Sequence, residues 1–500
     1  MKSFTHITLC GLTVATLLAA GCSGQQTIAT PDVKTFPAAG KGYLQVAESK
    51  RYFQFEDGTP FVIIGANEGM TWPDLDGAYA NANPERTEAY FRMLHDHGVN
   101  TIRIMAEYSQ DGYHNLEKPI GSYVPETVDY WDRIFKLADQ YDLYVLLTPW
   151  DTFWMNQNWE VNPYNAANGG PAKSKHDFLT SPAVRDAQKQ RLKFMIDRWG
   201  NSDHLLAWEI MNEADMWWEA SPDEIKAWID EMSLFVKTYE QQKWGKNHMI
   251  TFSTAKAVPD GTLGDAVFNH PDIDFSNTHL YAEPAVNAPV NAIDAAVSFD
   301  QDIAGAQTMM QTPKPFTDTE SGPITEWITD HDLDHEYFHN MSWAHLMAGG
   351  AGFGMRWPYL EPHTLTETMR DHQLAMSKFA RTIDWTHFPS RNIDKDAAID
   401  QAGVKIFGSG DGRQAILWLL QDTSAHRFQD LTADKIKRYE EAILTLNGMS
   451  EVPAAFEVRF WDTYAGSLIS TVKVPNDKGT LKVELPAFTK DLALHILPLQ

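Results

Sequence analysis

The sequence predicts an α/β fold: a (β/α)8 TIM barrel followed by a small C-terminal antiparallel β-sandwich domain. Eight short apolar segments alternate with helix-length segments over about 340 residues, which is typical of a barrel with long loops. The first apolar segment is not followed by a glycine-rich GxGxxG turn, so a doubly wound open sheet is less favoured. From about residue 391, short alternating segments with Gly, Asp and Asn turns replace the helices, which predicts the second domain.

Each predicted element has its own local signal. The barrel strands are short, mostly apolar runs at 60–67, 99–105, 143–148, 205–211, 249–253, 273–280, 316–319 and 352–356. Helical periodicity is clear at 84–97, 126–141, 183–199 and 223–239. Later strands are expected at 404–407, 415–420, 442–446, 456–461, 467–474 and 480–485. We therefore expect the barrel over residues 42–390 and the β-domain over residues 391–500.

The N-terminus has the pattern of an export signal. Lys2 precedes an apolar stretch that ends in Ala19-Ala20-Gly21-Cys22, and this run resembles a bacterial lipoprotein signal. We expect a signal peptide over residues 1–21, lipidation of Cys22, and a linker over residues 22–41 that is rich in Gln, Thr, Pro, Ala and Gly. The protein would then be exported and anchored by lipid in the bacterial cell envelope, at the outer membrane or in the periplasm. A plain secretory signal is the alternative.

Charge and composition limit the possible partners. The chain has 41 Lys and Arg against 67 Asp and Glu, a formal net charge of −26, which disfavours nucleic acid and anionic lipid surfaces. The 17 Trp favour a sugar substrate, because flat aromatic rings suit sugar faces as well as cores. We expect a carbohydrate substrate, membrane contact through the lipid alone, no nucleic acid and no obligate protein partner.

Polar side chains follow the predicted strands at their carboxyl ends, where a barrel places its active site. They are Asn67, Arg103, Trp150 with Asp151, the run WEIMNE ending at Glu213, His279 with Tyr281, Glu320, and Trp357. Two carboxylates facing each other across a barrel mouth are what cleavage of a glycosidic bond requires. An Asn-Glu pair also ends at Glu68, so the dipeptide alone does not select Glu213.

The ordered motifs GAN, IR, WEIMNE, HLY, DTESG and RW resemble the retaining glycoside hydrolases of the family 5 type, in clan A. The resemblance spans about residues 43–388 and implies that Glu213 is the general acid/base and Glu320 the nucleophile. It also implies substrate-binding or orienting roles for Arg103, Asn212, His279, Tyr281 and Trp357. The anomeric configuration would be retained, with carboxyl groups about 5 to 5.5 Å apart.

Further expectations follow from these roles. Arg103 beside Glu320 should lower the pKa of that carboxyl, while the less compensated Glu213 stays protonated. Many relatives carry a His where this chain has Pro149-Trp150-Asp151, and this difference leaves the identity of the sugar substrate open. Trp150 and Asn67 are candidate sugar contacts. Glu209 is expected to be a buried partner of Arg103 or of a neighbouring strand, and not a catalyst.

The function predicted is endo cleavage of an uncharged β-linked polysaccharide or oligosaccharide of the β-mannan or β-glucan type. Exo action on oligosaccharides and a noncatalytic glycan-binding surface lipoprotein are the alternatives. An esterase is disfavoured because the sequence has no GxSxG serine elbow. No cofactor and no metal site are expected, since no HExxH motif occurs. The histidines at positions 331, 335, 339 and 345 are interpreted as a helix face.

Overall fold

We describe a computed structural model of the chain for residues 41–109, 112–281, 285–286, 288–322, 331–359 and 361–499. The predicted signal peptide, the lipidation of Cys22 and nearly all of the predicted linker lie outside the described residues.

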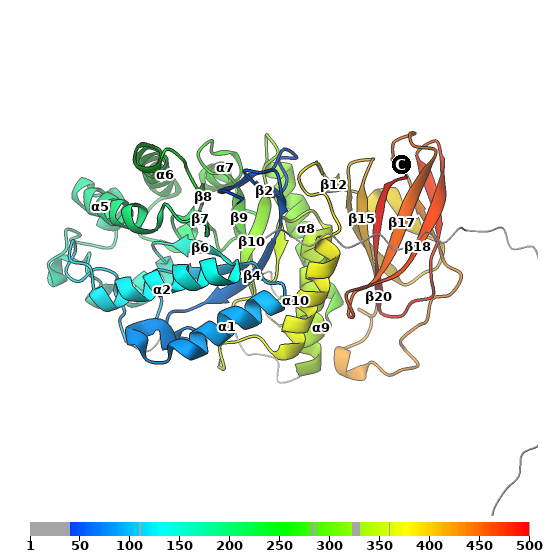
Figure 1. Ribbon diagram of the computed structural model, residues 1–500, viewed down its shortest axis with the longest axis horizontal. Coiled ribbons are helices and arrows are strands. Elements are labelled where there is room, and N and C mark those ends of the chain that lie inside the picture. The colour runs from blue at the N-terminus through cyan, green and yellow to red at the C-terminus, as the bar shows by residue number, and fades with distance from the viewer. Residues whose placement is uncertain are drawn as a thin grey trace, which may run out of the picture.

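Eight parallel strands form the barrel, and all eight coincide with predicted segments (Figure 1). They are β4 (Ile63–Glu68), β5 (Thr101–Met105), β6 (Tyr144–Thr148), β7 (Leu205–Glu209), β8 (Met249–Thr251), β9 (Ser276–Leu280), β10 (Phe316–Ser321) and β11 (Gly352–Phe353). Strands β11-β4-β5-β6-β7-β8 make one curled sheet, and β9 pairs with β10. Backbone hydrogen bonds from His279 N to Thr254 O (2.9 Å) and from Ala351 N to Phe316 O (2.7 Å) connect the two sheets into a ring.

Helices surround these strands. They are α1 (Pro84–Asp96), α2 (Pro125–Tyr141), α5 (Pro182–Trp199), α6 (Pro222–Trp244), α7 (Gly261–Asn269), α8 (Ile293–Met309), α9 (His331–Met347) and α10 (Glu367–Ala380). Proline at the first helical position starts α1, α2, α5 and α6, where its missing N–H and fixed φ cost nothing. Shorter helices α3 (Thr152–Gln157) and α4 (Asp177–Thr180) lie in the loop after β6. Among the described residues, none of these helices is both long and apolar enough to cross a membrane.

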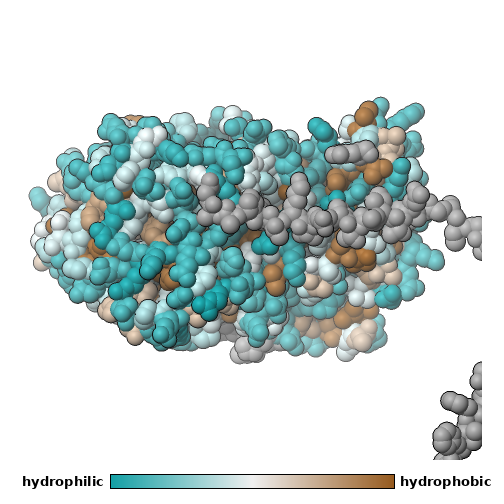
Figure 2. Space-filling view, in the orientation of Figure 1, coloured by the Kyte–Doolittle hydropathy of each residue, from teal (hydrophilic) through white to brown (hydrophobic). Residues whose placement is uncertain are grey.

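The C-terminal domain is a nine-stranded antiparallel sheet, as the change of pattern near residue 391 predicts. Its strands are β12 (Arg391–Asn392), β13 (Ala397–Ile399), β14 (Val404–Gly410), β15 (Ala415–Gln421), β16 (Ile443–Leu446), β17 (Ala455–Asp462), β18 (Ser467–Asp477), β19 (Thr480–Glu484) and β20 (Asp491–Pro498). They are ordered β12-β14-β15-β20-β17-β18-β19-β16-β13. Figure 2 shows a largely hydrophilic face, with its larger apolar patches over this domain.

Strand β15 belongs to two cores at once, because successive side chains of a strand point to opposite faces. Leu417 and Leu419 lie in the core of the β-domain, whereas Ile416, Trp418 and Leu420 belong to the core that continues into the barrel. Figure 1 shows α9 and α10 between the barrel strands and the β-domain. The β-domain therefore packs firmly against the barrel helices.

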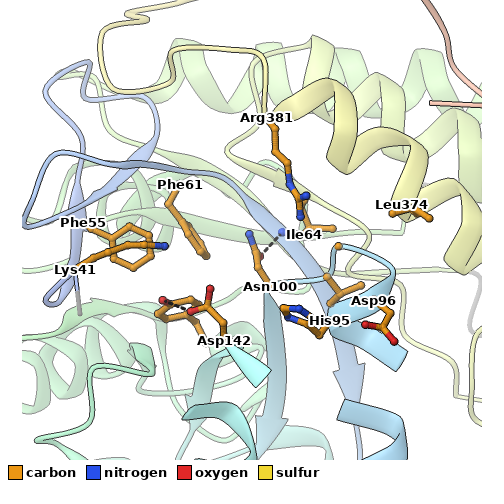
Figure 3. A pocket seen from close by; sticks show the side chains of 13 residues that line it. Lys41, Phe55, Phe61, Ile64, His95, Asp96, Asn100, Asp142, Leu374 and Arg381 are labelled. Carbon is orange, nitrogen blue, oxygen red and sulfur yellow. Dashed lines mark hydrogen bonds between the residues drawn. The ribbon is translucent and has the colours of Figure 1, made fainter. Parts of the chain in front are cut away.

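The hairpin of β1 (Leu44–Val46) and β2 (Phe53–Phe55), extended by β3 (Pro60–Phe61), covers the amino ends of the barrel strands. Beside it lies a cavity of about 400 Å³, which we call the amino-end hollow (Figure 3). Its lining includes Lys41, Asn100, Asp142 and Arg381, and Lys41 and Arg381 enter from different sides. This hollow is at the opposite end of the barrel from the predicted active site.

Candidate active site

Glu213 lies just beyond the carboxyl end of β7, in a turn that leads into the 3-10 helix η4 (Ala214–Met216). Its backbone is left-handed (φ 47°, ψ 56°), a conformation that costs a non-glycine residue about 1 to 3 kcal/mol. Two hydrogen bonds hold the turn. The Glu213 N–H donates to Ser253 Oγ (3.0 Å), and the Thr152 hydroxyl donates to the Glu213 carbonyl oxygen (2.9 Å). The strained turn is therefore fixed from two neighbouring strand ends.

Glu320 is placed by β10. The pairing register of β10 with β9 shifts between Asp318 and Ser321, and such irregularities commonly re-aim a side chain beside an active site. Two donors reach the Glu320 carboxylate: Arg103 Nη1 donates to Oε2 (2.9 Å), and the Tyr281 hydroxyl donates to Oε1 (3.0 Å). The side chain is 7% exposed, so these donors replace most of the water that a carboxylate would otherwise bind.

Arg103 organises the floor of the site with all five of its N–H donors. Nε and Nη2 donate to the two oxygens of Glu209 (2.6 and 3.0 Å). The remaining donors reach Asn67 Oδ1 (3.2 Å), Glu320 Oε2 (2.9 Å) and Asn212 Oδ1 (2.5 Å). Burial alone would raise the pKa of Glu209, but the charge and hydrogen bonds of Arg103 outweigh burial and lower it. The prediction that Glu209 is a buried partner of Arg103 is confirmed.

Glu213 and Glu320 face each other with His279 between them. A carboxylate oxygen from each and a ring nitrogen of His279 all lie within 4.8 Å of one another. His279 Nδ1 is hydrogen-bonded to Glu213 Oε1 (2.8 Å) and lies 3.8 Å from Glu320 Oε2. Retaining glycosidases hold their carboxyl groups about 5 to 5.5 Å apart, whereas inverting ones need about 6.5 to 9.5 Å. These three side chains are also the one group of potential metal ligands found among the described residues.

The two carboxyl groups differ in their surroundings. The pKa of Glu213 is raised to about 8, first by burial and then by the negative charges of Asp151 and Asp215. Among the described residues, the side chain hydrogen-bonded to the Glu213 carboxyl is His279, and burial lowers the pKa of that ring, which favours the neutral imidazole. Glu213 is therefore suited to hold a proton at neutral pH.

The pKa of Glu320 is also raised, which differs from the expectation that Arg103 would lower it. Burial is the largest cause, and the nearby ring of His279 and the charge and hydrogen bond of Arg103, which lower the pKa, only partly offset it. Even so, Glu320 accepts hydrogen bonds from Arg103 and Tyr281 that Glu213 lacks. The contacts therefore favour the ionised form at Glu320 more than at Glu213.

Asp151, which the sequence analysis placed at a strand end without giving it a role, is a member of the site. Its carboxylate caps α3 by accepting from Phe153 N (3.2 Å) and Trp154 N (2.8 Å), and it also accepts from Asn212 Nδ2 (2.7 Å). Asn212 Oδ1 meanwhile accepts from Arg103 and from Ser253 Oγ (3.1 Å). An Asp just before a helix start is a typical N-cap, which was the available signal. Its contact with Asn212 could not be read from the chain.

Aromatic side chains gather at the carboxyl end of the barrel. Trp357 contacts Trp72 (ring centroids 4.5 Å apart) and Tyr108 (5.3 Å) in one cluster. Four half-buried aromatic side chains pack against it: Phe153, Trp154, Tyr281 and Tyr359. Because Tyr281 also contacts Glu320, the cluster adjoins the carboxylates, and its four half-buried members offer flat surfaces on which a sugar ring can stack.

Trp150, a predicted sugar contact, is instead part of the protein core. It is only 2% exposed and packs edge-on against Phe178 and Trp228. The Arg191 guanidinium lies over its ring, 5.5 Å from the centroid. The side chain turns away from the mouth toward α5 and α6, so the structure gives it no route to a substrate.

Asn67, the other such candidate, is also fully occupied. Its Nδ2 donates to Thr319 O and Met355 O (both 2.8 Å), and its Oδ1 accepts from Arg103. Both amide hydrogens are used, so Asn67 ties neighbouring strands together and leaves no donor for a sugar. Glu68 points elsewhere, because it accepts a hydrogen bond from the Tyr90 hydroxyl of α1.

The predicted histidine helix is α9. His339 Nε2 lies 2.8 Å from Asp491 Oδ2 in the β-domain, His345 Nε2 lies 3.2 Å from Asp318 Oδ1, and the His335 ring is hydrogen-bonded to Thr366. These side chains therefore reach different partners. The side chain of His331 lies outside the described residues.

Comparison with known proteins gives a consistent result. The family model for cellulase (glycosyl hydrolase family 5) matches residues 56–330, more than half of the chain, and this span includes Glu213 and Glu320. Mannan endo-1,4-beta-mannosidase 2 of Oryza sativa subsp. japonica is 25% identical over 264 residues, which cover 46% of this chain and 56% of that protein. This chain spans about half to two thirds of the length of such curated relatives.

The fold is shared with solved structures over almost the whole chain. A glycoside hydrolase family 5 protein from Bacteroides vulgatus superimposes with a TM-score of 0.59 at 14% identity, covering 93% of this chain and 95% of that one. The coverage shows that the likeness extends over the barrel and the C-terminal β-domain together.

Proposed function

We propose, from the premise that this chain belongs to glycosyl hydrolase family 5, that it is a retaining β-glycoside hydrolase acting on a β-mannan-type polysaccharide. Glu320 would be the nucleophile and Glu213 the general acid/base. One observation carries this assignment: Arg103 and Tyr281 bond to the Glu320 carboxylate, whereas Glu213, close beside it, has a raised pKa and no such donors.

In the first step, Glu320 attacks the anomeric carbon and forms a covalent glycosyl ester. The bond to the leaving oxygen breaks, and that oxygen takes the proton of Glu213. In the second step, the Glu213 carboxylate removes a proton from water, the resulting hydroxide attacks the anomeric carbon, and Glu320 leaves. His279, hydrogen-bonded to Glu213, would keep its carboxyl group oriented through both steps.

The electrostatics support an uncharged substrate. All five donors of Arg103 are engaged with protein atoms, so this buried guanidinium has none left to bind a uronate carboxylate. The half-buried aromatic side chains packed against Trp72 and Trp357 supply apolar faces instead. Among uncharged polymers we favour β-mannan over β-glucan, and endo over exo action, because curated relatives carry the name mannan endo-1,4-beta-mannosidase.

The test is release of reducing sugar by the full chain from β-mannan, mixed and linear β-glucans, xylan and galactan. We expect release from β-mannan, a mixture of short products typical of endo cleavage, and loss of release in Glu213→Gln and Glu320→Gln. Glu68→Gln is the matched control, because Glu68 also ends a strand Asn-Glu pair but contacts Tyr90. Binding without release would support the glycan-binding alternative. Release that survives both substitutions would overturn the assignment.

We also propose export and lipid anchoring, on the basis of the N-terminal sequence that ends at Cys22. In the producing cell, mass spectrometry should find a diacylglyceryl group on Cys22, and Cys22→Ala should move the protein out of the membrane fraction. An unmodified mature N-terminus would instead indicate a plain secretory signal.

A further inference from the structure

A second pocket lies at the seam between the barrel and the β-domain, and we call it the seam pocket. It has a volume of about 370 Å³ and lies where α9 meets the segment that follows β15. Its lining includes Glu336 and Asn340 of α9, with Gln421, Phe428, Tyr464 and Lys490 of the β-domain. None of them takes part in the active site described above.

We propose that the seam pocket is a noncatalytic binding site for a short uncharged carbohydrate chain of the same class as the substrate. The identity of the sugar rests on the proposed function, whereas the pocket rests on independent observations. Its volume is within the range of about 300 to 1,000 Å³ that small-ligand sites occupy.

The first observation is a buried polar atom without a partner. Asn340 is 2% exposed, and its Nδ2 donates to Ala292 O (3.0 Å). Its Oδ1 accepts no hydrogen bond from any residue that the structure describes. A buried acceptor in this state is destabilising unless a ligand or water donates to it. A sugar hydroxyl is such a donor.

The second observation concerns charge. Glu336 receives hydrogen bonds at both oxygens, one from the Lys490 ammonium and one from the Tyr464 hydroxyl (2.5 Å). The acid and the base in the pocket therefore neutralise each other. Asp332, the other charged lining residue, is exposed. Paired charges favour a neutral polar ligand over an ion, because an ion would have to displace one partner.

The third observation is an aromatic wall. Phe428 is half-buried, and its backbone N–H donates to Val290 O (3.0 Å), which fixes this segment against the barrel. Tyr464 is less available, since its ring stacks on His339 with centroids 4.2 Å apart and Lys490 lies over it. Phe428 is therefore the ring that can cover the C–H face of a sugar.

The pocket is also on the same end of the barrel as the active site. Asn291 and Asp332 line it, and they follow β9 and β10, the strands that present Tyr281 and Glu320 at their carboxyl ends. If a polysaccharide were bound in the seam pocket, the rest of the polymer would lie at the same end of the barrel as the active site. This gives the β-domain a role in retaining the polymer.

The experiment uses the full chain with Glu320→Gln, which removes turnover, titrated calorimetrically with β-1,4-mannohexaose. We expect two binding events. Adding Phe428→Ala should weaken one of them about tenfold and leave the other unchanged. Ile469→Ala, at an apolar side chain of β18 that is 48% exposed and does not line the pocket, is the matched control and should change neither. Asn340→Leu, accepted only if its thermal midpoint matches that of the parent, should act like Phe428→Ala.

The outcomes separate this proposal from the proposed function. Hydrolysis of β-mannan by the unsubstituted chain, with a single binding event that Phe428→Ala leaves intact, would overturn the seam pocket alone. No hydrolysis, with one event that Phe428→Ala weakens, would overturn the proposed function and support the pocket. Absence of both hydrolysis and binding would overturn both.

Discussion

The two ends of the barrel differ in how their polar side chains are stabilised. At the amino-end hollow, two polar side chains are hydrogen-bonded to their neighbours: Asn100 accepts from Ile64 N (2.8 Å) and donates to Val62 O (2.9 Å), and Asp142 accepts from the Tyr144 hydroxyl (2.9 Å). At the mouth, two carboxyl groups lie side by side, and burial raises the pKa of both.

The difference shows what each end contributes. Matched hydrogen bonds at the amino ends stabilise the strands, and barrels generally use that face for stability. The buried carboxyl pair at the mouth, whose pKa values burial raises, destabilises the folded state but keeps a proton donor and a nucleophile ready together. Substitutions at the two ends should therefore separate activity from stability.

The largest effect is expected from Glu320→Gln. The amide cannot form the glycosyl ester, so kcat on β-mannan should fall by about four orders of magnitude, or about 5.5 kcal/mol in barrier. The thermal midpoint should stay equal or rise, because the neutral amide does not carry the burial penalty that raises the pKa of the Glu320 carboxyl. Steady-state kinetics and calorimetry check the two halves. A large drop in thermal midpoint would show that the carboxylates at the mouth also stabilise the fold.

Asn100→Ala should give the reverse pattern at the other end of the barrel. It leaves Ile64 N and Val62 O without their side-chain partners, which should reduce the free energy of unfolding by about 1 to 3 kcal/mol. The kcat of the folded protein should not change. Denaturant unfolding measured beside kcat tests this, and a tenfold loss of kcat would break the comparison.

Asp151→Asn should move the pH profile. The charge of Asp151 is the second largest cause of the raised pKa of Glu213, so removing it lowers that pKa from about 8. The active form needs Glu213 protonated, so activity declines as pH rises through this pKa, and the decline should begin about one pH unit earlier in the variant. An Asn can still accept from Asn212 Nδ2, which limits the structural change. An unchanged alkaline limb in kcat/KM would contradict this.

Lys41→Met should have the smallest effect. The Lys41 ammonium lies over the Phe55 ring, 4.6 Å from its centroid, an interaction worth about 0.5 to 1 kcal/mol. Burial already lowers the pKa of Lys41, so losing the charge also relieves a desolvation penalty. We expect the free energy of unfolding to change by less than about 1 kcal/mol and kcat to stay the same. A loss above 2 kcal/mol, measured in urea, would show that the hollow depends on this cation.

The barrel could be predicted from the sequence because buried parallel strands are nearly continuous apolar runs, as in LYVLLT at 143–148. The carboxylates could be placed because they stand at strand ends within the motifs WEIMNE and DTESG. Side-chain direction beyond a strand end could not be predicted in the same way. Trp150 and Asn67 therefore looked like sugar contacts, although one turns into the core and the other binds backbone carbonyls.

The prediction of a lowered pKa for Glu320 was wrong for a different reason. The partner Arg103 could be inferred from the family pattern, but the depth of burial could not, and burial decides the sign of the shift. The contact between Asp151 and Asn212 also depends on how two loops meet, since 61 residues separate them in the chain.

Strand β15, whose two faces belong to different cores, also determines when the barrel core can close during synthesis. On the ribosome, α9 and α10 emerge before β15 and β17, so side chains such as Trp343 and Phe379 stay uncovered until Trp418 and Trp461 have been made. Until about residue 461 has been made, the barrel presents an unsealed apolar flank, which is the state most exposed to aggregation and chaperone capture. A nascent chain stalled at the end of the barrel would thus be a client for quality control and not a finished enzyme.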